Sequence, residues 1–242
     1  MSGEPPKAHA GAGDAGWAAL RREVVRDAAA VGVAVGTYGV SYGALGTTSG
    51  LSVAQTCALS VLAFTGGSQF ALVGVLGAGG SGVAGTATAL MLGLRNTLYG
   101  LRLAPTLQVR GLHRLLAAHL VIDETTAMTL AQPVARAGRL AFWATGLAVF
   151  SLWNLATLVG ALGATALGDP KRFGLDAAVG AAFLGLLWPR LKRRVAWVVG
   201  LGAAAVALAL TPVLPPGLPV LAAGLVAVAV GLARPDAAQE PR

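Results

Sequence analysis

The chain has 242 residues, of which 55% are hydrophobic and 12% are charged, whereas about a quarter of the residues in an ordinary soluble domain are charged. So few charged residues cannot coat a water-soluble domain of this size, and the composition excludes that class. The net charge of +8 comes from Lys and Arg placed between apolar runs, as at the edges of membrane helices, so we expect a lipid bilayer and no nucleic acid as a partner.

Residues 1–27 are rich in Gly, Ala and Pro and end with Arg21, Arg22 and Arg26. They contain no short apolar segment followed by a small-residue cleavage site, so we expect no cleaved signal peptide. This segment is predicted to be a flexible cytoplasmic tail, and the polar residues 234–242 are predicted to form a second tail. The single domain between them, 28–233, is predicted to lie in the membrane.

Two long runs, 28–94 and 195–233, contain no charged residue and no His. A membrane-spanning helix needs about 20 apolar residues, so the pattern predicts an all-α, polytopic transmembrane helix bundle of about seven or eight spans. The expected spans are 28–46, 52–76, 83–104, 112–132, 140–167, 173–189, 195–211 and 218–233.

The segment 112–132 either crosses the membrane or lies at its surface, because it carries His119, Asp123 and Glu124. If it crosses, both termini are cytoplasmic, and we favour this eight-span arrangement. If it does not, the N-terminus is external. In both cases the basic stretch PRLKRR, 189–194, marks a cytoplasmic loop, and the loop 211–219 is expected outside.

Glycines recur every three or four residues through the first expected span, and they are Gly32, Gly36, Gly39, Gly43, Gly46 and Gly50. Such a stripe lets helix backbones approach closely, and it is also a candidate docking face for a partner. A second hypothesis is that glycines interrupt a helix at a binding site, for which Gly66 and Gly67 are the better candidates. The segments beginning at Asp27 and Asp176 resemble each other, which leaves inverted repeats open as a further feature.

Polar side chains inside the apolar runs indicate where a solute binds. Ser68 and Gln69 follow Gly66 and Gly67, where a helix break would free backbone groups for the carboxylate and ammonium of an amino acid. Arg95 either binds a substrate carboxylate or pairs with Asp123 or Glu124, and Asn96 and Tyr99 are expected to line the same cavity. The substrate-binding candidates are Gly66, Gly67, Ser68, Gln69, Arg95, Asn96 and Tyr99.

In HLVIDET, helical spacing places His119 and Asp123 on one face and Glu124 on the adjacent face. A carboxyl group at membrane depth is suited to relay protons, so these three residues are the candidates for proton coupling, with a solvated surface helix as the alternative. One His and two acids are too few for a metal site. We expect no metal, no cofactor and no enzyme, because no nucleophile and base are suitably spaced and no phosphate-binding loop occurs.

These same segments resemble the AzlC family, the large subunits of bacterial branched-chain amino acid exporters. The pieces that carry the resemblance are GVSYGALGTTSGLSVAQ, GGSQFA, LGLRNTLYG, IDET and GDPKRFGLDAAVGAAFLGLLWP, in that order along the chain. The family often has Asn-x-Arg-His where this chain has Gly93, Leu94, Arg95 and Asn96, so only the arginine carries over.

The resemblance implies a multi-pass protein of the bacterial cytoplasmic membrane that exports valine, leucine, isoleucine and also methionine together with a small AzlD-like membrane subunit. The acids at 123 and 124 favour the proton gradient as the driving force. The alternative is a transporter or channel subunit for another small solute.

Overall fold

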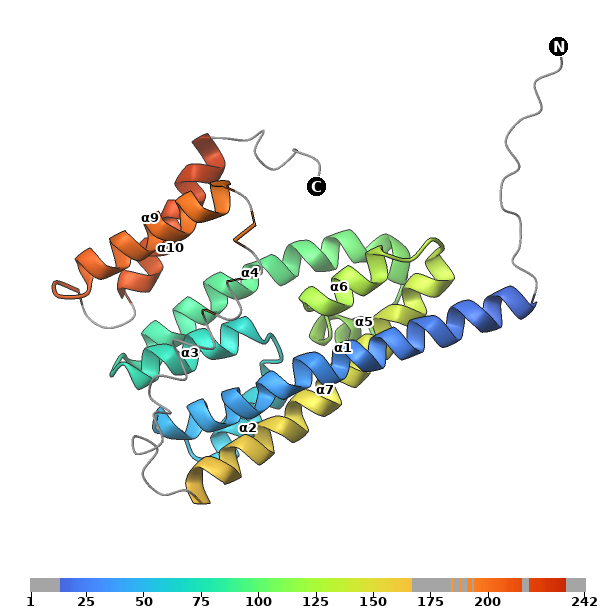
Figure 1. The fold of residues 1–242 in the computed structure, drawn as a ribbon, viewed down its shortest axis with the longest axis horizontal. Coiled ribbons are helices and arrows are strands. Elements are labelled where there is room, and N and C mark those ends of the chain that lie inside the picture. Colours follow the sequence, from blue (N-terminus) through green and yellow to red (C-terminus); the bar gives the residue numbers. More distant parts are fainter. Residues whose placement is uncertain are drawn as a thin grey trace, which may run out of the picture.

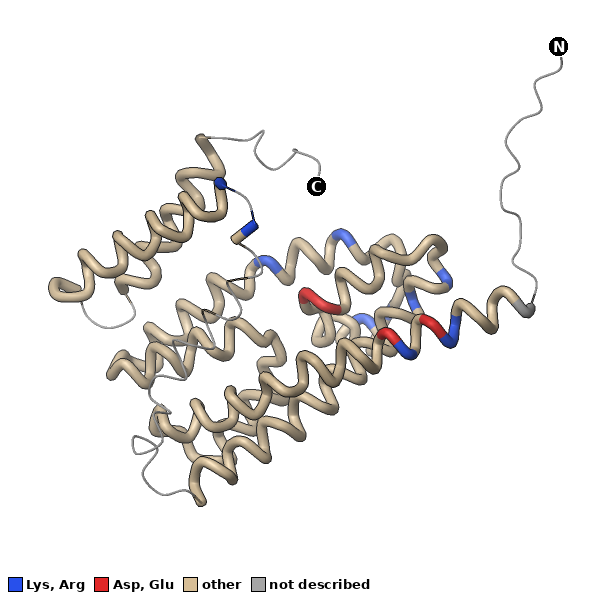
Figure 2. The backbone as a smooth tube through the Cα atoms, in the orientation of Figure 1, with Lys and Arg blue, Asp and Glu red and all other residues tan. Residues whose placement is uncertain are grey.

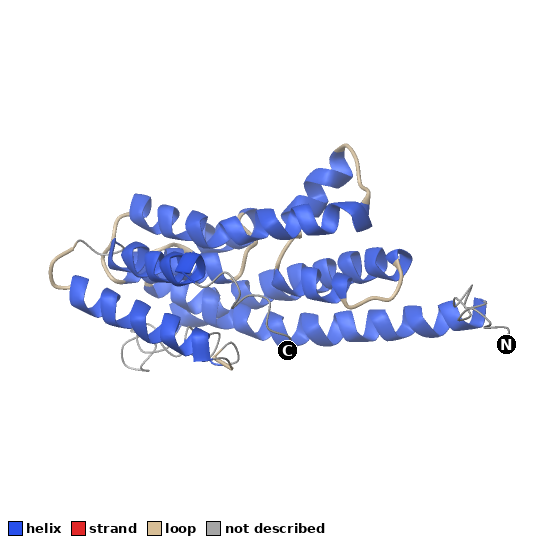
Figure 3. Ribbon diagram, turned by 90° about the horizontal axis from the view of Figure 1, so that it is seen from above, coloured by secondary structure: helices blue, strands red, loops and turns tan. Residues whose placement is uncertain are grey.

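The structure is a computed structural model, and it describes residues 14–166, 184, 188, 191, 192, 194–214 and 218–233. In this part of the chain every regular element is a helix and none is a strand (Figure 3), which confirms the all-α prediction. The helices are α1 (Asp14–Thr48), α2 (Val53–Leu62), α3 (Gly67–Gly77), α4 (Gly82–Leu107), α5 (Leu112–His119), α6 (Asp123–Leu130), α7 (Ala135–Ala166), α9 (Arg194–Leu210) and α10 (Leu218–Ala233).

The two longest helices, α1 and α7, lie side by side and run in the same direction (Figure 1). A Cβ added at Gly32 would lie 2.8 Å from the Cβ of Ala148, and one added at Gly36 would lie 2.8 Å from the Cβ of Leu152. The residue number of the contact on α7 therefore rises with that of the glycine on α1, as it does when two helices are parallel. The predicted packing role of the glycine stripe is confirmed. Its use as a docking face for another subunit is contradicted from Gly32 to Gly46, because α7 covers the first four glycines and Thr56 of α2 covers Gly46, while a Cβ added at Gly50 would meet nothing within 4 Å.

The expected span 52–76 is not one continuous helix. Its two halves, α2 and α3, form what we call the first broken pair, which enters the bundle and returns to the same end. A Cβ added at Gly77, the last residue of α3, would lie 2.8 Å from the Oγ of Ser49, just after α1. Both outer ends of the first broken pair therefore lie where α1 ends. A buried contact of 3.2 Å between the hydroxyls of Ser60 and Thr157 fixes α2 against α7.

The expected span 112–132 is broken in the same way, and α5 and α6 form the second broken pair. A Cβ added at Gly138, near the start of α7, would lie 3.2 Å from Thr106 and 3.3 Å from the carbonyl oxygen of Thr129. The end of α4, the end of α6 and the start of α7 thus meet. The second broken pair therefore enters from the end of the bundle opposite to the first.

These contacts define an inverted arrangement within the described residues. Helix α1 is followed by a broken pair that enters at its far end, and α4, which runs the other way, is followed by a broken pair that enters at the opposite end (Figure 1). Each pair begins within three residues of a glycine that has a positive φ and precedes a leucine, with φ 94° at Gly50 and 55° at Gly111. The repeat expected from the segments at Asp27 and Asp176 is a different one, and its second copy lies outside the described residues.

The start of α1 also differs from the sequence prediction. Residues 14–27, predicted to be flexible, form the first turns of α1, so the tail prediction is wrong there. The spans expected at 83–104 and 140–167 correspond to α4 and α7, and those at 195–211 and 218–233 to α9 and α10. The remaining tail residues and most of the expected span 173–189 lie outside the described residues.

Two helices of the described chain are long and apolar enough to cross a bilayer, namely Gly16–Thr48 and Ala135–Ala166. Shorter apolar helices are α2, α3, α9 and α10. Helices α9 and α10 pack on each other, and a Cβ added at Gly202 would lie 3.2 Å from Val226. Helix α10 reaches the rest of the bundle through Gly224, which lies against Met91 of α4.

Candidate functional site

The breaks of the two broken pairs meet inside the bundle. Phe64, in the first break, lies 6.1 Å from the ring of His119, the last residue of α5, and 5.1 Å from the ring of Phe150 on α7. His119 and Phe150 are themselves 5.8 Å apart, so three rings from three elements form one cluster. In an apolar bundle, backbone freed from helical hydrogen bonds is tolerated where it is buried in protein or lines a cavity.

The first break depends on Gly66, whose φ of 61° is unfavourable for residues with a Cβ. Its carbonyl oxygen accepts hydrogen bonds from the N–H groups of Gln69 and Phe70, which starts α3. Gly66 has no side chain with which to cap the helix. The Gln69 amide nitrogen donates to the carbonyl oxygen of Leu59 at 3.1 Å and so ties α3 back to α2 across the break.

The second break is held by the hydroxyl of Thr125. It accepts a hydrogen bond from the N–H of Ile122 at 3.0 Å, and it lies 2.8 Å from the carbonyl oxygen of Leu120, which has lost its helical partner. The hydroxyl of Thr126 donates to the carbonyl oxygen of Ile122 at 2.8 Å. The threonines after Asp123 and Glu124 therefore supply the hydrogen bonds that a continuous helix would have made.

Arg95, in the middle of α4, connects the two breaks. Its Nη1 lies 3.2 Å from an Oδ of Asp123 in the first turn of α6, and the two side chains are 26% and 22% exposed. On the other side, a Cβ added at Gly67 would lie 3.3 Å from Nη2, so the guanidinium sits over the start of α3. Of the two roles expected for Arg95, the structure shows the pairing with Asp123.

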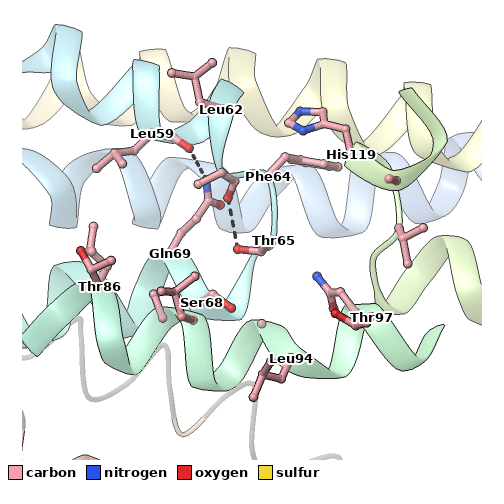
Figure 4. Close-up of a pocket in the computed structure, with 18 of the residues that line it drawn as sticks. Leu59, Leu62, Phe64, Thr65, Ser68, Gln69, Thr86, Leu94, Thr97 and His119 are labelled. Carbon is pink, nitrogen blue, oxygen red and sulfur yellow. Dashed lines mark hydrogen bonds between the residues drawn. The ribbon is translucent and has the colours of Figure 1, made fainter. Parts of the chain in front are cut away.

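Two cavities lie beside the breaks, and Phe64 and Thr65 line both of them. The larger, which we call the leucine cavity, has a volume of about 450 Å³. Figure 4 shows α3, α4 and the end of α5 around it. Its main lining residues are Leu59, Leu62, Phe64, Thr65, Ser68, Gln69, Leu72, Thr86, Ala89, Leu90, Leu94, Asn96, Thr97, His119 and Val121.

Four polar atoms of residues that line the leucine cavity have no hydrogen-bond partner among the described residues. They are the hydroxyl of Tyr42, the Oγ of Ser68, the Oε1 of Gln69 and the Oδ1 of Asn96. Ser68 and Gln69 are 4% and 3% exposed, so these atoms are hidden from bulk solvent. Buried polar atoms are normally paired, so unpaired ones at a cavity wall are suited to meet a ligand.

The smaller cavity, which we call the arginine cavity, has a volume of about 270 Å³ and lies toward α1 and α7. Arg95, Asp123 and Glu124 all line it, so it contains the charged groups. Its main lining residues are Val35, Tyr38, Phe64, Thr65, Gly66, Gly67, Phe70, Leu92, Arg95, Ile122, Asp123, Glu124, Val149 and Trp153.

The structure divides the sequence-predicted residues between the two cavities. Gly66, Gly67 and Arg95 line the arginine cavity, whereas Ser68, Gln69 and Asn96 line the leucine cavity. The expectation that Arg95, Asn96 and Tyr99 share one cavity is therefore wrong, because successive residues of a helix point in different directions. Tyr99 packs against the buried apolar core.

The proton-coupling candidates are also divided. His119 lines the leucine cavity, while Asp123 and Glu124 line the arginine cavity. The prediction that His119 and Asp123 share a helical face is wrong, because the break at Leu120–Ile122 interrupts the helical spacing between them. No group of three or more His, Cys, Asp or Glu side chains that could hold a metal ion occurs within the described residues.

Several residues at the site were missed from the sequence. Phe64 and Phe150 are aromatic residues in apolar runs, and only their contact with His119 distinguishes them. The repeated threonines at 125 and 126, directly after two acids, were a usable signal, because Thr side chains commonly bond to nearby backbone. Trp153, which lies within the apolar run 140–167, also lines the arginine cavity.

Comparison with known proteins gives one family. The family model described as AzlC protein matches residues 30–167, which include the second half of α1, both broken pairs, α4 with Arg95, and the whole of α7. Searches of curated proteins and of solved structures returned no match to the chain.

Proposed function

Because this chain belongs to the AzlC family, which is associated with branched-chain amino acid transport, we propose that it is the membrane subunit of an exporter of valine, leucine and isoleucine, with methionine as a further substrate. The proposal rests chiefly on one observation: two broken helix pairs enter an apolar bundle from opposite ends and meet beside a cavity with unpaired polar atoms. Transporters place broken helices at the substrate site because the freed backbone groups and helix ends hold polar parts of a solute.

The charge distribution supports a cytoplasmic N-terminus. Figure 2 shows most of the Lys and Arg of helices α1 to α7 toward the end of the bundle where α1 begins, whereas those at the start of α9 lie away from that end. At this end Arg136 at the start of α7 stacks over the ring of Trp17, 3.9 Å from its centroid, and Arg139 donates to the carbonyl oxygen of Thr106 at 3.1 Å. Lys and Arg accumulate on the cytoplasmic side, so this end would face the cytoplasm of a bacterial cell.

A proton gradient is the proposed driving force, with Asp123 as the carrier and Glu124 and His119 beside the same breaks. A proton on Asp123 would remove the charge that pairs with Arg95. That pair joins α4 to the start of α6 beside the start of α3, so its loss would free the second broken pair to move relative to α4. Movement of the broken pairs is what would alternate access to the cavity between the two sides.

A small AzlD-like membrane subunit is proposed as the partner, on the strength of the family. With the glycine stripe covered by α7 and α2 from Gly32 to Gly46, this subunit would bind another face of the bundle. Full transport by the purified single chain would rule out an obligate partner.

Efflux of labelled amino acids tests the function directly. Cells or vesicles that contain the full chain together with the AzlD-like subunit are preloaded with leucine, valine or methionine, with labelled lysine as a charged control. We expect faster efflux of the three apolar amino acids than of lysine, and collapse of that difference when the proton gradient is dissipated. Equal efflux of all four solutes, or none above the empty membrane, would contradict the proposal.

A further inference from the structure

We infer that the leucine cavity is the substrate site and that it takes a net-neutral zwitterion with an apolar side chain, bound at Ser68, Gln69 and Asn96 and not at Arg95. The inference rests on the proposed transport function and adds to it the place and the orientation of the substrate.

Size and lining distinguish the two cavities. The leucine cavity, at about 450 Å³, falls in the range of about 300–1,000 Å³ that is usual for small-molecule sites, whereas the arginine cavity holds about 270 Å³. Five leucines from α2, α3 and α4 line the larger one, and they are Leu59, Leu62, Leu72, Leu90 and Leu94. Burying a branched aliphatic side chain against these walls is favourable in proportion to the apolar area removed from water.

Charge restricts the ligand further. Among the described residues that line the leucine cavity there is no Asp, Glu, Lys or Arg. A ligand with a net charge would lose its hydration there without gaining a counter-ion, which is strongly unfavourable. A zwitterion carries its own counter-charge and needs only dipoles around its two ends.

The unpaired polar atoms supply those dipoles. The Gln69 amide nitrogen is engaged by the Leu59 carbonyl, so the atom left free at the cavity is the oxygen, an acceptor suited to an ammonium group. The side-chain oxygen of Asn96 is a second acceptor. The Ser68 hydroxyl can donate to a carboxylate, and it lies in the first turn of α3, where the helix dipole favours negative charge and Gly66 provides no side-chain cap.

The arginine cavity is less suitable for the carboxylate. Arg95 already faces Asp123 at 3.2 Å, and Glu124 lines the same cavity. A substrate carboxylate placed there would compete with Asp123 for Arg95 and would lie close to two carboxylates of its own sign, those of Asp123 and Glu124. Arg95 is therefore assigned to joining the two broken pairs, as a positioning residue.

Direct binding separates these possibilities. The full chain, co-purified with the AzlD-like subunit in lipid nanodiscs, is titrated with labelled leucine. Isocaproate and isoamylamine, which lack the ammonium and the carboxylate respectively, are used as competitors. Ala89→Leu places a larger side chain in the leucine cavity, and Ala104→Leu makes the same change at an exposed position of the same helix, outside both cavities. Ser68→Ala removes only the hydroxyl.

We expect leucine to bind and both competitors to fail, with affinity about tenfold or more weaker in Ala89→Leu and about tenfold weaker in Ser68→Ala. Ala104→Leu should bind as the wild type does. Unchanged leucine affinity in Ala89→Leu would overturn the inference about the binding site, but it would not contradict the proposed export function. If the wild type prefers another neutral apolar amino acid and Ala89→Leu weakens that binding, the proposed substrate is wrong and the inference stands. Binding of charged solutes only, or of no neutral amino acid, overturns it.

Discussion

The contact between α1 and α7 can be tested with two glycines of the same helix. A Cβ added at Gly160 would overlap the backbone of Val40, with the carbonyl oxygen in contact, the carbonyl carbon at 2.7 Å and the Cα at 2.9 Å. A Cβ added at Gly163, one turn further along α7, would meet nothing within 4 Å. The obstacle at Gly160 is backbone, so it cannot be relieved by a rotamer change, and the two helices would have to separate.

The magnitude follows from two opposing effects. Gly→Ala in a helix interior gains about 1 kcal/mol of helix propensity at either position. Forcing extra volume into a packed interface costs about 1–3 kcal/mol, and this applies only to Gly160→Ala. The difference between the two variants is therefore the overpacking cost itself. For a chain of this length, 1 kcal/mol corresponds to about 2–4 °C, so a cost of about 2 kcal/mol would lower the melting temperature of Gly160→Ala by about 4–8 °C relative to Gly163→Ala.

Intrinsic tryptophan fluorescence during heating of the detergent-solubilised protein measures this difference. Both variants are heated at one scan rate, because membrane proteins often unfold irreversibly and the midpoint then depends on the rate. We expect Gly163→Ala to melt at or slightly above the wild type and Gly160→Ala clearly below it. Equal melting temperatures for the two variants would show that α7 does not meet the backbone of α1 at Gly160.

Three further predictions concern the breaks. Thr125→Val removes the hydroxyl that bonds the second break and should cost about 1–3 kcal/mol, whereas Thr165→Val, which loses a bond within one helix, should melt close to the wild type. Phe64→Ala removes the ring that lines both cavities and should make proteoliposomes leaky to protons. Phe142→Ala, an equal truncation in the core, should not, and proton-tight vesicles with Phe64→Ala would contradict the prediction. Asp123→Asn should keep leucine exchange but lose its dependence on an imposed pH gradient, and retained dependence would eliminate Asp123 as the proton carrier.

The sequence by itself determined the class of the protein and several of its local features. Long uncharged runs and scarce charges indicate an all-helical protein, and hydrophobic length locates α4, α7, α9 and α10 to within a few residues. The interruption at Gly66 was predictable because two adjacent glycines within an apolar run can adopt backbone angles that other residues avoid. The positive φ of Gly66 agrees with this local property. The same holds for the stripe of glycines in α1, whose spacing alone shows that one helix face lacks side chains.

Only the tertiary structure decided the path of the chain and the grouping of the site. The length of an apolar run is the same whether a segment crosses the bundle once or enters and returns, so hydropathy does not distinguish a span from a broken pair. Contacts remote in sequence do distinguish them, such as Gly77 with Ser49 and Gly138 with Thr106. Likewise, Arg95 had two acids as candidate partners and a substrate as a third, and the position of α6 selects Asp123. Neighbours such as Arg95 and Asn96 came to line different cavities because a helix rotates each residue about 100° from the last, and which direction holds a cavity depends on what packs around that helix.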